Sequence, residues 1–116
     1  MKKVVVFGAG LVVRAHVRYL LDQGFEVTVA SRTVSKAETI VDGHPLGTPM
    51  AFDIAKQGDQ LEGIVAAHDV AVSLLPFQYH PQVARACLNT GRHMVTTSYV
   101  KEEMRNLDQA ASRATK

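Results

Sequence analysis

The sequence predicts an open, doubly wound parallel α/β sheet, with five strands in the spatial order 3-2-1-4-5 when numbered along the chain. An uninterrupted apolar run over residues 4–7 is typical of a central strand buried on both faces. A turn with two glycines follows it directly, and strand and helix patterns then alternate about every 20 to 25 residues. These observations favour parallel strands joined by crossover helices.

The glycine turn is the first candidate binding feature. Gly8 can adopt a positive φ, and Gly10 has no Cβ, so a diphosphate can approach the amides that open the next helix. Val13 stands where the G-x-G-x-x-G pattern has its third glycine, which implies a wider helix–strand spacing or a small residue opposite. Because the turn lies between a predicted strand and a predicted helix, we interpret it as the dinucleotide-binding turn of a Rossmann fold. A β–α turn that merely needs two glycines is the alternative.

Length and composition indicate one domain over residues 1–116, which is short for a complete dinucleotide-dependent enzyme. The chain is 47% hydrophobic and 21% charged, as in ordinary globular proteins. A net charge of +2 with scattered basic residues argues against a nucleic acid or a membrane surface as partner. The single Cys87 excludes an internal disulfide and a cysteine metal cluster, so we expect a packing residue, no metal site and a cytoplasmic location.

The first helix is predicted over about residues 10–23, with apolar residues at helical spacing and Gly24 as its stop. His16 falls away from the apolar stripe and is expected at the surface or in the crevice. Alternating residues over 25–30 then predict the second strand.

The segment Ser31-Arg32-Thr33, at the end of the second strand, bears on the choice of cofactor. NAD-specific domains place a carboxylate in this region, where it binds the adenosine ribose and would repel a 2′-phosphate. Arg32 can instead pair with a 2′-phosphate and stack on adenine, while the hydroxyl groups of Ser31 and Thr33 donate hydrogen bonds. We therefore expect NADP(H) in preference to NAD(H), with Lys36 adding nearby positive charge. A solvated loop arginine is the alternative reading of Arg32.

The second helix is expected after Thr33, with Ser35 and Glu38 spaced as a capping box. A loop over residues 42–47 precedes the third strand, over residues 48–52. Because Pro49 in that strand cannot donate to a β-ladder, we expect the third strand at an edge of the sheet.

Asp53 and Ile54 end the third strand on the crevice side. The carboxylate can accept a hydrogen bond from the adenine amino group, and the isoleucine can cover the ring; a carboxylate that only caps the next turn is the alternative. The third helix is predicted over about residues 59–67, with a capping box of Asp59 and Glu62.

The second strongly apolar strand, over residues 70–75, is expected beside the first across the topological switch point, where open α/β sheets bind ligands. The loop over residues 76–81 should then follow the nicotinamide half of a cofactor. Pro81 suits the first turn of a fourth helix that ends at Gly91. A fifth strand over residues 93–97 and a last helix follow.

The loop after the fourth strand carries Phe77, Tyr79 and His80, which could shape a substrate pocket. With no carboxylate partner identifiable, we favour a hydrophobic plug above the sheet, with His80 as a helix N-cap.

Four segments together resemble the N-terminal NADP-binding domain of the saccharopine dehydrogenase family, and best its glutamate-forming, saccharopine reductase branch. They are V-V-V-F-G-A-G-L-V-V, V-T-V-A-S-R-T, A-H-D-V-A-V-S-L-L-P-F-Q-Y-H-P and V-T-T-S-Y-V. The resemblance implies a two-domain oxidoreductase of lysine metabolism, which transfers hydride between NADP(H) and the carbon of a secondary amine or imine. A second domain, which would supply most substrate and dimer contacts, lies outside residues 1–116, so we expect little turnover from this chain alone.

The resemblance also implies five groups of contacts, carried over by position. Gly8, Gly10, Leu11 and Val12 would meet the diphosphate; Ser31, Arg32 and Thr33 the 2′-phosphate; Asp53 and Ile54 the adenosine; Leu74, Leu75 and Pro76 the ribose and nicotinamide side; Ser98 and Tyr99 the amino-acid-derived substrate. No catalytic residue is assigned.

A non-catalytic nucleotide-sensing module is the alternative function, since such a module also uses one Rossmann unit without a substrate domain. In either case the fifth strand would leave an open ladder edge. We expect that edge to pair with another copy of the chain or to be shielded by the last helix.

Overall fold

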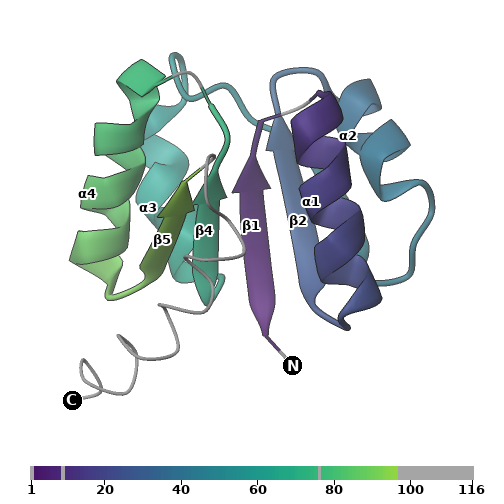
Figure 1. The fold of residues 1–116 in the computed structure, drawn as a ribbon. Helices are drawn as coiled ribbons and strands as arrows, with labels where there is room; N and C mark the ends of the chain where they lie inside the picture. Colours follow the sequence, from purple (N-terminus) through teal and green to yellow (C-terminus); the bar gives the residue numbers. More distant parts are fainter. Residues whose placement is uncertain (1, 9, 76, 97–116) are drawn as a thin grey trace.

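The computed structural model describes residues 2–8, 10–75 and 77–96, in which five parallel strands have the order β3-β2-β1-β4-β5 (Figure 1). The strands are β1 (Lys3–Phe7), β2 (Glu26–Ser31), β3 (Gly47–Ala51), β4 (Val70–Ser73) and β5 (His93–Thr96). The helices are α1 (Leu11–Asp22), α2 (Val34–Val41), α3 (Leu61–Ala66) and α4 (His80–Thr90), with short 3₁₀ turns η1 (Gly58–Gln60) and η2 (Phe77–Tyr79). The predicted fold class and strand order are confirmed.

The central strand is β1, as its apolar run predicts. Val6 pairs with Val29 of β2 on one side and with Val72 of β4 on the other. All pairs are parallel, so the carboxyl ends of the strands meet at one edge of the sheet, the upper edge in Figure 1. Pro49 lies in β3, which is an edge strand of the described sheet, so its predicted edge position is confirmed.

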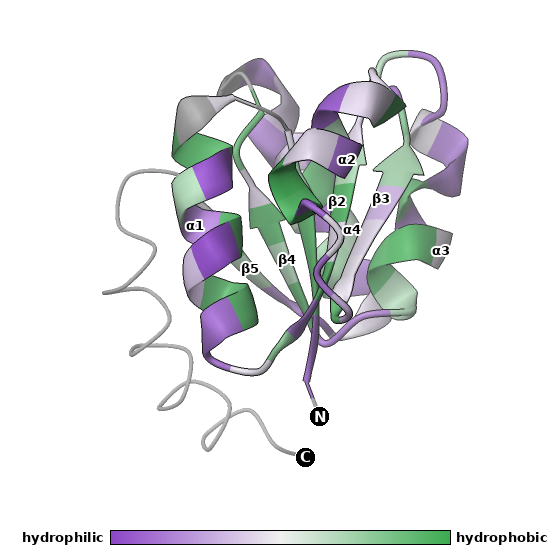
Figure 2. Ribbon diagram, turned by 90° about the vertical axis from the view of Figure 1, so that its right-hand side faces the viewer, coloured by the Kyte–Doolittle hydropathy of each residue, from purple (hydrophilic) through white to green (hydrophobic). Residues whose placement is uncertain are grey.

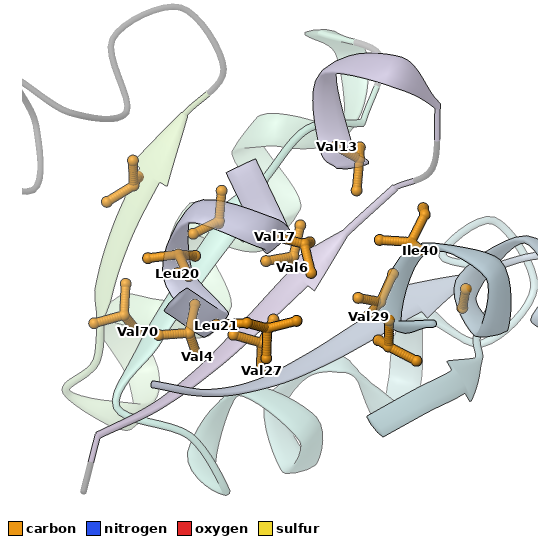
Figure 3. Close-up of a cluster of buried hydrophobic side chains, with 14 residues drawn as sticks. Val4, Val6, Val13, Val17, Leu20, Leu21, Val27, Val29, Ile40 and Val70 are labelled. Atoms are coloured by element: carbon orange, nitrogen blue, oxygen red, sulfur yellow. The ribbon is translucent and has the colours of Figure 1, made fainter. Parts of the chain in front are cut away.

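Two hydrophobic clusters cover the two faces of the sheet, because successive side chains of a strand point to opposite sides. Val4 and Val6 pack on one face under α1 and α2 (Figure 3). The same cluster contains the apolar residues predicted for α1, which are Val13, Val17, Leu20 and Leu21. Val5 and Phe7 pack on the other face under α3 and α4. Figure 2 shows hydrophobic and hydrophilic residues mixed along α1, as expected of a helix with one face on a sheet.

Both predicted capping boxes are wrong, because the helices begin at other residues. α2 begins at Val34, so Ser35 lies inside the helix, and Thr33 is an N-cap without a side-chain hydrogen bond. α3 begins at Leu61, after η1, with Gln60 as an N-cap that also lacks one. The predicted helix ends at Gly24 and Gly91 agree with the structure, where both glycines have positive φ, of 89° and 71°.

None of the helices in the described ranges is both long and apolar enough to span a bilayer. The predicted last helix and its shielding of β5 lie outside the described residues.

Leu20→Ala should lower the free energy of unfolding by about 2–5 kcal/mol, because the side chain is 1% exposed in the cluster under α1. Leu88→Ala is the matched control: Leu88 is 82% exposed on α4, so its loss should change stability by no more than about 0.5 kcal/mol. Urea unfolding of both variants measures the difference, and equal losses would contradict the assigned core.

Candidate functional site

The turn after β1 is held between the two neighbouring strands. The Gly8 amide donates to the Ala30 carbonyl at 2.9 Å, and the Leu74 amide donates to the Phe7 carbonyl at 3.0 Å. Gly8 has a φ of 129°, a conformation that L side chains rarely adopt. The predicted positive φ is confirmed, and the turn is anchored to both β2 and the end of β4.

Gly8 also lies next to Val13, the residue at the position of the third glycine in the G-x-G-x-x-G pattern. A Cβ on Gly8 would lie 3.0 Å from the Leu74 carbonyl oxygen and 3.4 Å from Cγ2 of Val13. Val13 itself is 2% exposed and points inward from the first turn of α1 (Figure 3). The small residue expected opposite Val13 is therefore Gly8.

The start of α1 is open toward the same edge of the sheet. Gly10 is its N-cap, with a φ of 126° and no side-chain cap, and a Cβ there would meet no atom within 4 Å. The first turn holds no acidic residue, and Val12 on it is 54% exposed. An anion can approach these amides, whose own helix supplies no acceptor for them.

A cavity of about 300 Å³ opens at the carboxyl ends of β1, β2, β3 and β4. It is lined by Phe7, Gly8, Ala30, Ser31, Arg32, Phe52, Asp53, Ile54, Leu74, Leu75, Gln78 and Tyr79. Its apolar part includes the tilted rings of Phe7 and Phe52, with centroids 5.6 Å apart. Its polar part lies at the ends of β2 and β3, where Ser31, Arg32 and Asp53 stand.

Ser31 and Arg32 present different polar groups to this cavity. Ser31 is 6% exposed, and its Oγ accepts a hydrogen bond from the Thr33 amide at 3.2 Å, so the hydroxyl proton is not used in that bond. The Arg32 side chain is exposed and forms no hydrogen bond or ion pair within the described part of the chain. Its guanidinium can therefore turn to an anion in the cavity without breaking an internal contact.

Asp53 caps the turn after β3 and lines the cavity, while its predicted contact with adenine stays a prediction. Its Oδ1 accepts from the Ala55 amide at 3.0 Å, so it caps the turn after β3, and it also lines the cavity beside Ile54. Capping and a place at the site are therefore compatible.

The structure brings together seven of the predicted cofactor-side residues around the cavity: Gly8, Ser31, Arg32, Asp53, Ile54, Leu74 and Leu75. Gly10 and Val12 lie on the neighbouring helix start, Leu11 is the first residue of α1, and Thr33 caps α2. Pro76, Ser98 and Tyr99 lie outside the described residues. The prediction missed Phe7, Ala30, Phe52 and Gln78 as lining residues, and a signal existed: each is adjacent to a predicted site residue or lies in the loop after β4.

His80 is not the helix N-cap that the sequence suggested. Tyr79 occupies the N-cap position, and His80 is the first residue of α4. Its Nδ1 lies 2.7 Å from Oγ of Ser73, a fully buried residue at the end of β4. Tyr79 packs against the cluster under α4 and lines the cavity, as expected of a plug residue.

Cys87 is a packing residue, as predicted. It is 3% exposed, its Sγ lies 3.7 Å from the His93 carbonyl, and burial raises the pKa of the thiol from 9.0 to about 11. A thiol that stays protonated is a poor nucleophile. The described residues also hold no group of three or more metal-ligating side chains.

The family profile described as the saccharopine dehydrogenase NADP binding domain matches residues 4–116. The chain belongs to the saccharopine dehydrogenase family. The predicted family, the Rossmann fold and the NADP-binding character of the domain are thereby confirmed, and neither this profile nor the relatives below support a non-catalytic sensing module.

Relatives of this saccharopine dehydrogenase domain are longer proteins. The chain is 39% identical over 113 residues to saccharopine dehydrogenase (NADP(+), L-glutamate-forming) of Pyricularia oryzae, covering 97% of the chain and 25% of that protein. It is 34% identical over 114 residues to the mitochondrial alpha-aminoadipic semialdehyde synthase of Bos taurus, and the match covers 97% of the chain and 12% of that protein. The solved apo saccharopine dehydrogenase (L-Glu forming) of Saccharomyces cerevisiae matches with a TM-score of 0.77 at 29% identity, and the match covers 92% of the chain and 24% of that structure. The chain thus spans a quarter or less of the length of these relatives.

Gly8→Ala should destabilise the domain by roughly 1–3 kcal/mol or more, because the side chain would occupy a positive φ and approach the Leu74 carbonyl. Gly63→Ala is the matched control, since Gly63 lies in α3 with open space around it and without a positive φ. It should be neutral or stabilising by up to about 1 kcal/mol. Chemical unfolding of the two variants decides the point, and a neutral Gly8→Ala would refute the close approach.

Cys87 predicts a pH dependence of stability. The unfolded thiol loses its proton near pH 9.0 and the folded thiol only near 11, so the folded state binds more protons between these values. The free energy of unfolding should therefore fall as pH rises from 9 to 11, and this part of the slope should vanish in Cys87→Ala. Unfolding curves at several pH values test it. Identical slopes for the two proteins would show that the thiol is not protected.

Proposed function

We propose that this domain binds NADP(H) across the carboxyl edge of its sheet, as the cofactor half of an oxidoreductase acting on a C–N bond. The observation that carries the proposal is one cavity that joins the Gly8 turn to Ser31 and Arg32. NADP(H) needs both ends at once: a backbone that admits its diphosphate and a cation for its 2′-phosphate.

The residues at the site fit this cofactor. Gly8 and Gly10 both have a positive φ, and a Cβ on Gly10 would meet no atom of the described residues within 4 Å, so a ligand can approach the backbone there. We infer that these glycines and the first amides of α1, from Leu11 and Val12, hold the diphosphate.

The charges at the start of α2 support a 2′-phosphate there. The first turn of α2 has no acidic residue but carries Lys36, and Arg32 precedes the helix. Two cations at the positive end of a helix dipole are unfavourable without an anion. We infer that Arg32, Ser31 and Thr33 hold the 2′-phosphate, which relieves this arrangement.

The remaining contacts are divided between adenosine and nicotinamide. Asp53 and Ile54 would hold the adenine side, while Leu74, Leu75 and Pro76 would line the ribose and nicotinamide side. NADP(H), when bound, supplies or accepts the hydride through its nicotinamide ring. The domain contributes orientation and exclusion of water from one side.

The substrate and the assembly belong to the same proposal. Because relatives are named L-glutamate-forming saccharopine dehydrogenases, we propose that the complete enzyme acts on an amino-acid conjugate of that kind, in lysine metabolism, with Ser98 and Tyr99 facing it. Pairing of two copies along β5, at the edge of the described sheet, and a cytoplasmic location stay predictions.

Arg32→Ala should weaken NADP(H) binding by about tenfold or more and leave NAD(H) binding nearly unchanged, because a charge-assisted bond to a phosphate contributes about 1.5–3 kcal/mol. Isothermal titration calorimetry of the wild type should show tighter binding of NADP(H) than of NAD(H). Arg85→Ala, which removes an exposed arginine of α4 away from the cavity, should keep that difference. Equal wild-type affinities for the two cofactors would remove the NADP assignment.

A further inference from the structure

The turn after β3, residues 53–57, is closed by hydrogen bonds in both directions. The Gln57 amide donates to the Asp53 carbonyl at 2.7 Å, and the Lys56 amide donates to the same oxygen at 3.1 Å. In return, the Asp53 amide donates to the side-chain Oε1 of Gln57 at 2.9 Å. Gln57 therefore holds both the N–H and the C=O of Asp53.

Hydrogen bonds to both polar atoms of the Gln57 side-chain amide set its orientation. Oε1 faces the Asp53 amide, and Nε2 donates to Oε1 of Gln60 at 3.3 Å, so the two atoms of this amide are not interchangeable. The backbone of Asp53 is thus fixed by a side chain that does not itself line the cavity.

The carboxylate of Asp53 is fixed as well. Oδ1 accepts from the Ala55 amide at 3.0 Å, whereas Oδ2 has no hydrogen-bond or ion-pair partner among residues 2–8, 10–75 and 77–96. Neighbouring side chains prevent the turn from shifting, because Phe52 and Ile54 are 4% and 5% exposed in the core under α3. One carboxylate oxygen of this cavity-lining residue therefore remains available.

We propose that Gln57 is a positioning residue that holds Asp53 as an acceptor at the base-binding end of the cavity, so that the site selects a 6-amino purine over a 6-oxo purine. An ionised carboxylate can only accept hydrogen bonds. The 6-amino group of adenine donates one, while the 6-oxo group of hypoxanthine is an acceptor and would oppose the carboxylate. This inference rests on the proposed function, which places the adenine at Asp53 and Ile54.

The same geometry makes Asp53→Asn informative. The Ala55 amide requires an acceptor, so the oxygen of the asparagine should take the place of Oδ1 and its NH₂ group the place of Oδ2. The group offered to the base changes from acceptor to donor. The variant should therefore lose the preference for a 6-amino purine or reverse it.

The test is the ratio of dissociation constants for NADP⁺ and nicotinamide hypoxanthine dinucleotide phosphate, measured by isothermal titration calorimetry. The wild type should bind NADP⁺ about tenfold more tightly. Asp53→Asn should bring the ratio to one or below, and Gln57→Ala should bring it toward one. Gln57→Glu keeps an acceptor for the Asp53 amide and should retain the ratio. Gln60→Ala is the matched control and should retain the ratio, because it removes the partner of Nε2 but leaves the bond between the Asp53 amide and Oε1 of Gln57.

The ratio separates positioning from a general structural effect. If Gln57 served only stability, Gln57→Ala would weaken both dinucleotides by the same factor, and this result would overturn the proposal. Equal wild-type affinities for the two dinucleotides would overturn it while leaving the NADP site intact. Binding of neither would overturn the proposed function too. The wild type and Asp53→Asn decide the base preference even if Gln57→Ala does not fold.

Discussion

The close approach of Gly8 to the Leu74 carbonyl is the constraint on which the rest of the site depends. The Phe7 carbonyl binds the Leu74 amide, so the chain leaving β4 stays beside the turn that leaves β1. Val13 lies beside the same turn, since a Cβ on Gly8 would be 3.4 Å from its Cγ2. A side chain at Gly8 would approach the Leu74 carbonyl too closely and would occupy a positive φ. The missing Cβ therefore permits the close approach of the β1 turn to the end of β4 at the switch point.

Hydrophobic clusters cover both faces of the sheet, and the cavity with Ser31, Arg32 and Asp53 lies at its carboxyl edge. The buried polar residues in the described part of the chain are Ser31 and Ser73, and each ends a strand at this edge. Each hydroxyl binds the segment that follows: Ser31 accepts from the Thr33 amide, and Ser73 pairs with the ring of His80. These hydrogen bonds connect the loops to the strand ends, so the residues that line the cavity are held in place by the sheet.

The strand order could be predicted because its signals are local and strong. The valine-rich run of β1 marks a strand buried on both faces, and Pro49 marks an edge. The starts of α2 and α3 could not be predicted, since a capping-box spacing such as Ser35 and Glu38 carries meaning only if the first turn begins there, and α2 begins at Val34. The pairing of Phe7 with Phe52 was not predicted, although the strand order places β1 and β3 on either side of β2, because it depends on how the two rings are oriented across β2.

Opposite charges at the cavity serve different ends of one ligand only if they do not neutralise each other. Arg32 and Asp53 both line the cavity, yet no ion pair joins them among the described residues. One oxygen of the carboxylate is held by the Ala55 amide of its own turn, which fixes the orientation of the carboxylate, whereas the Arg32 side chain is exposed. A pair between them would remove the cation from a 2′-phosphate and the acceptor from a base. Arg32 and Asp53 are therefore separately available, so the dinucleotide proposed above would meet a cation at one end and an acceptor at the other, from adjacent strands.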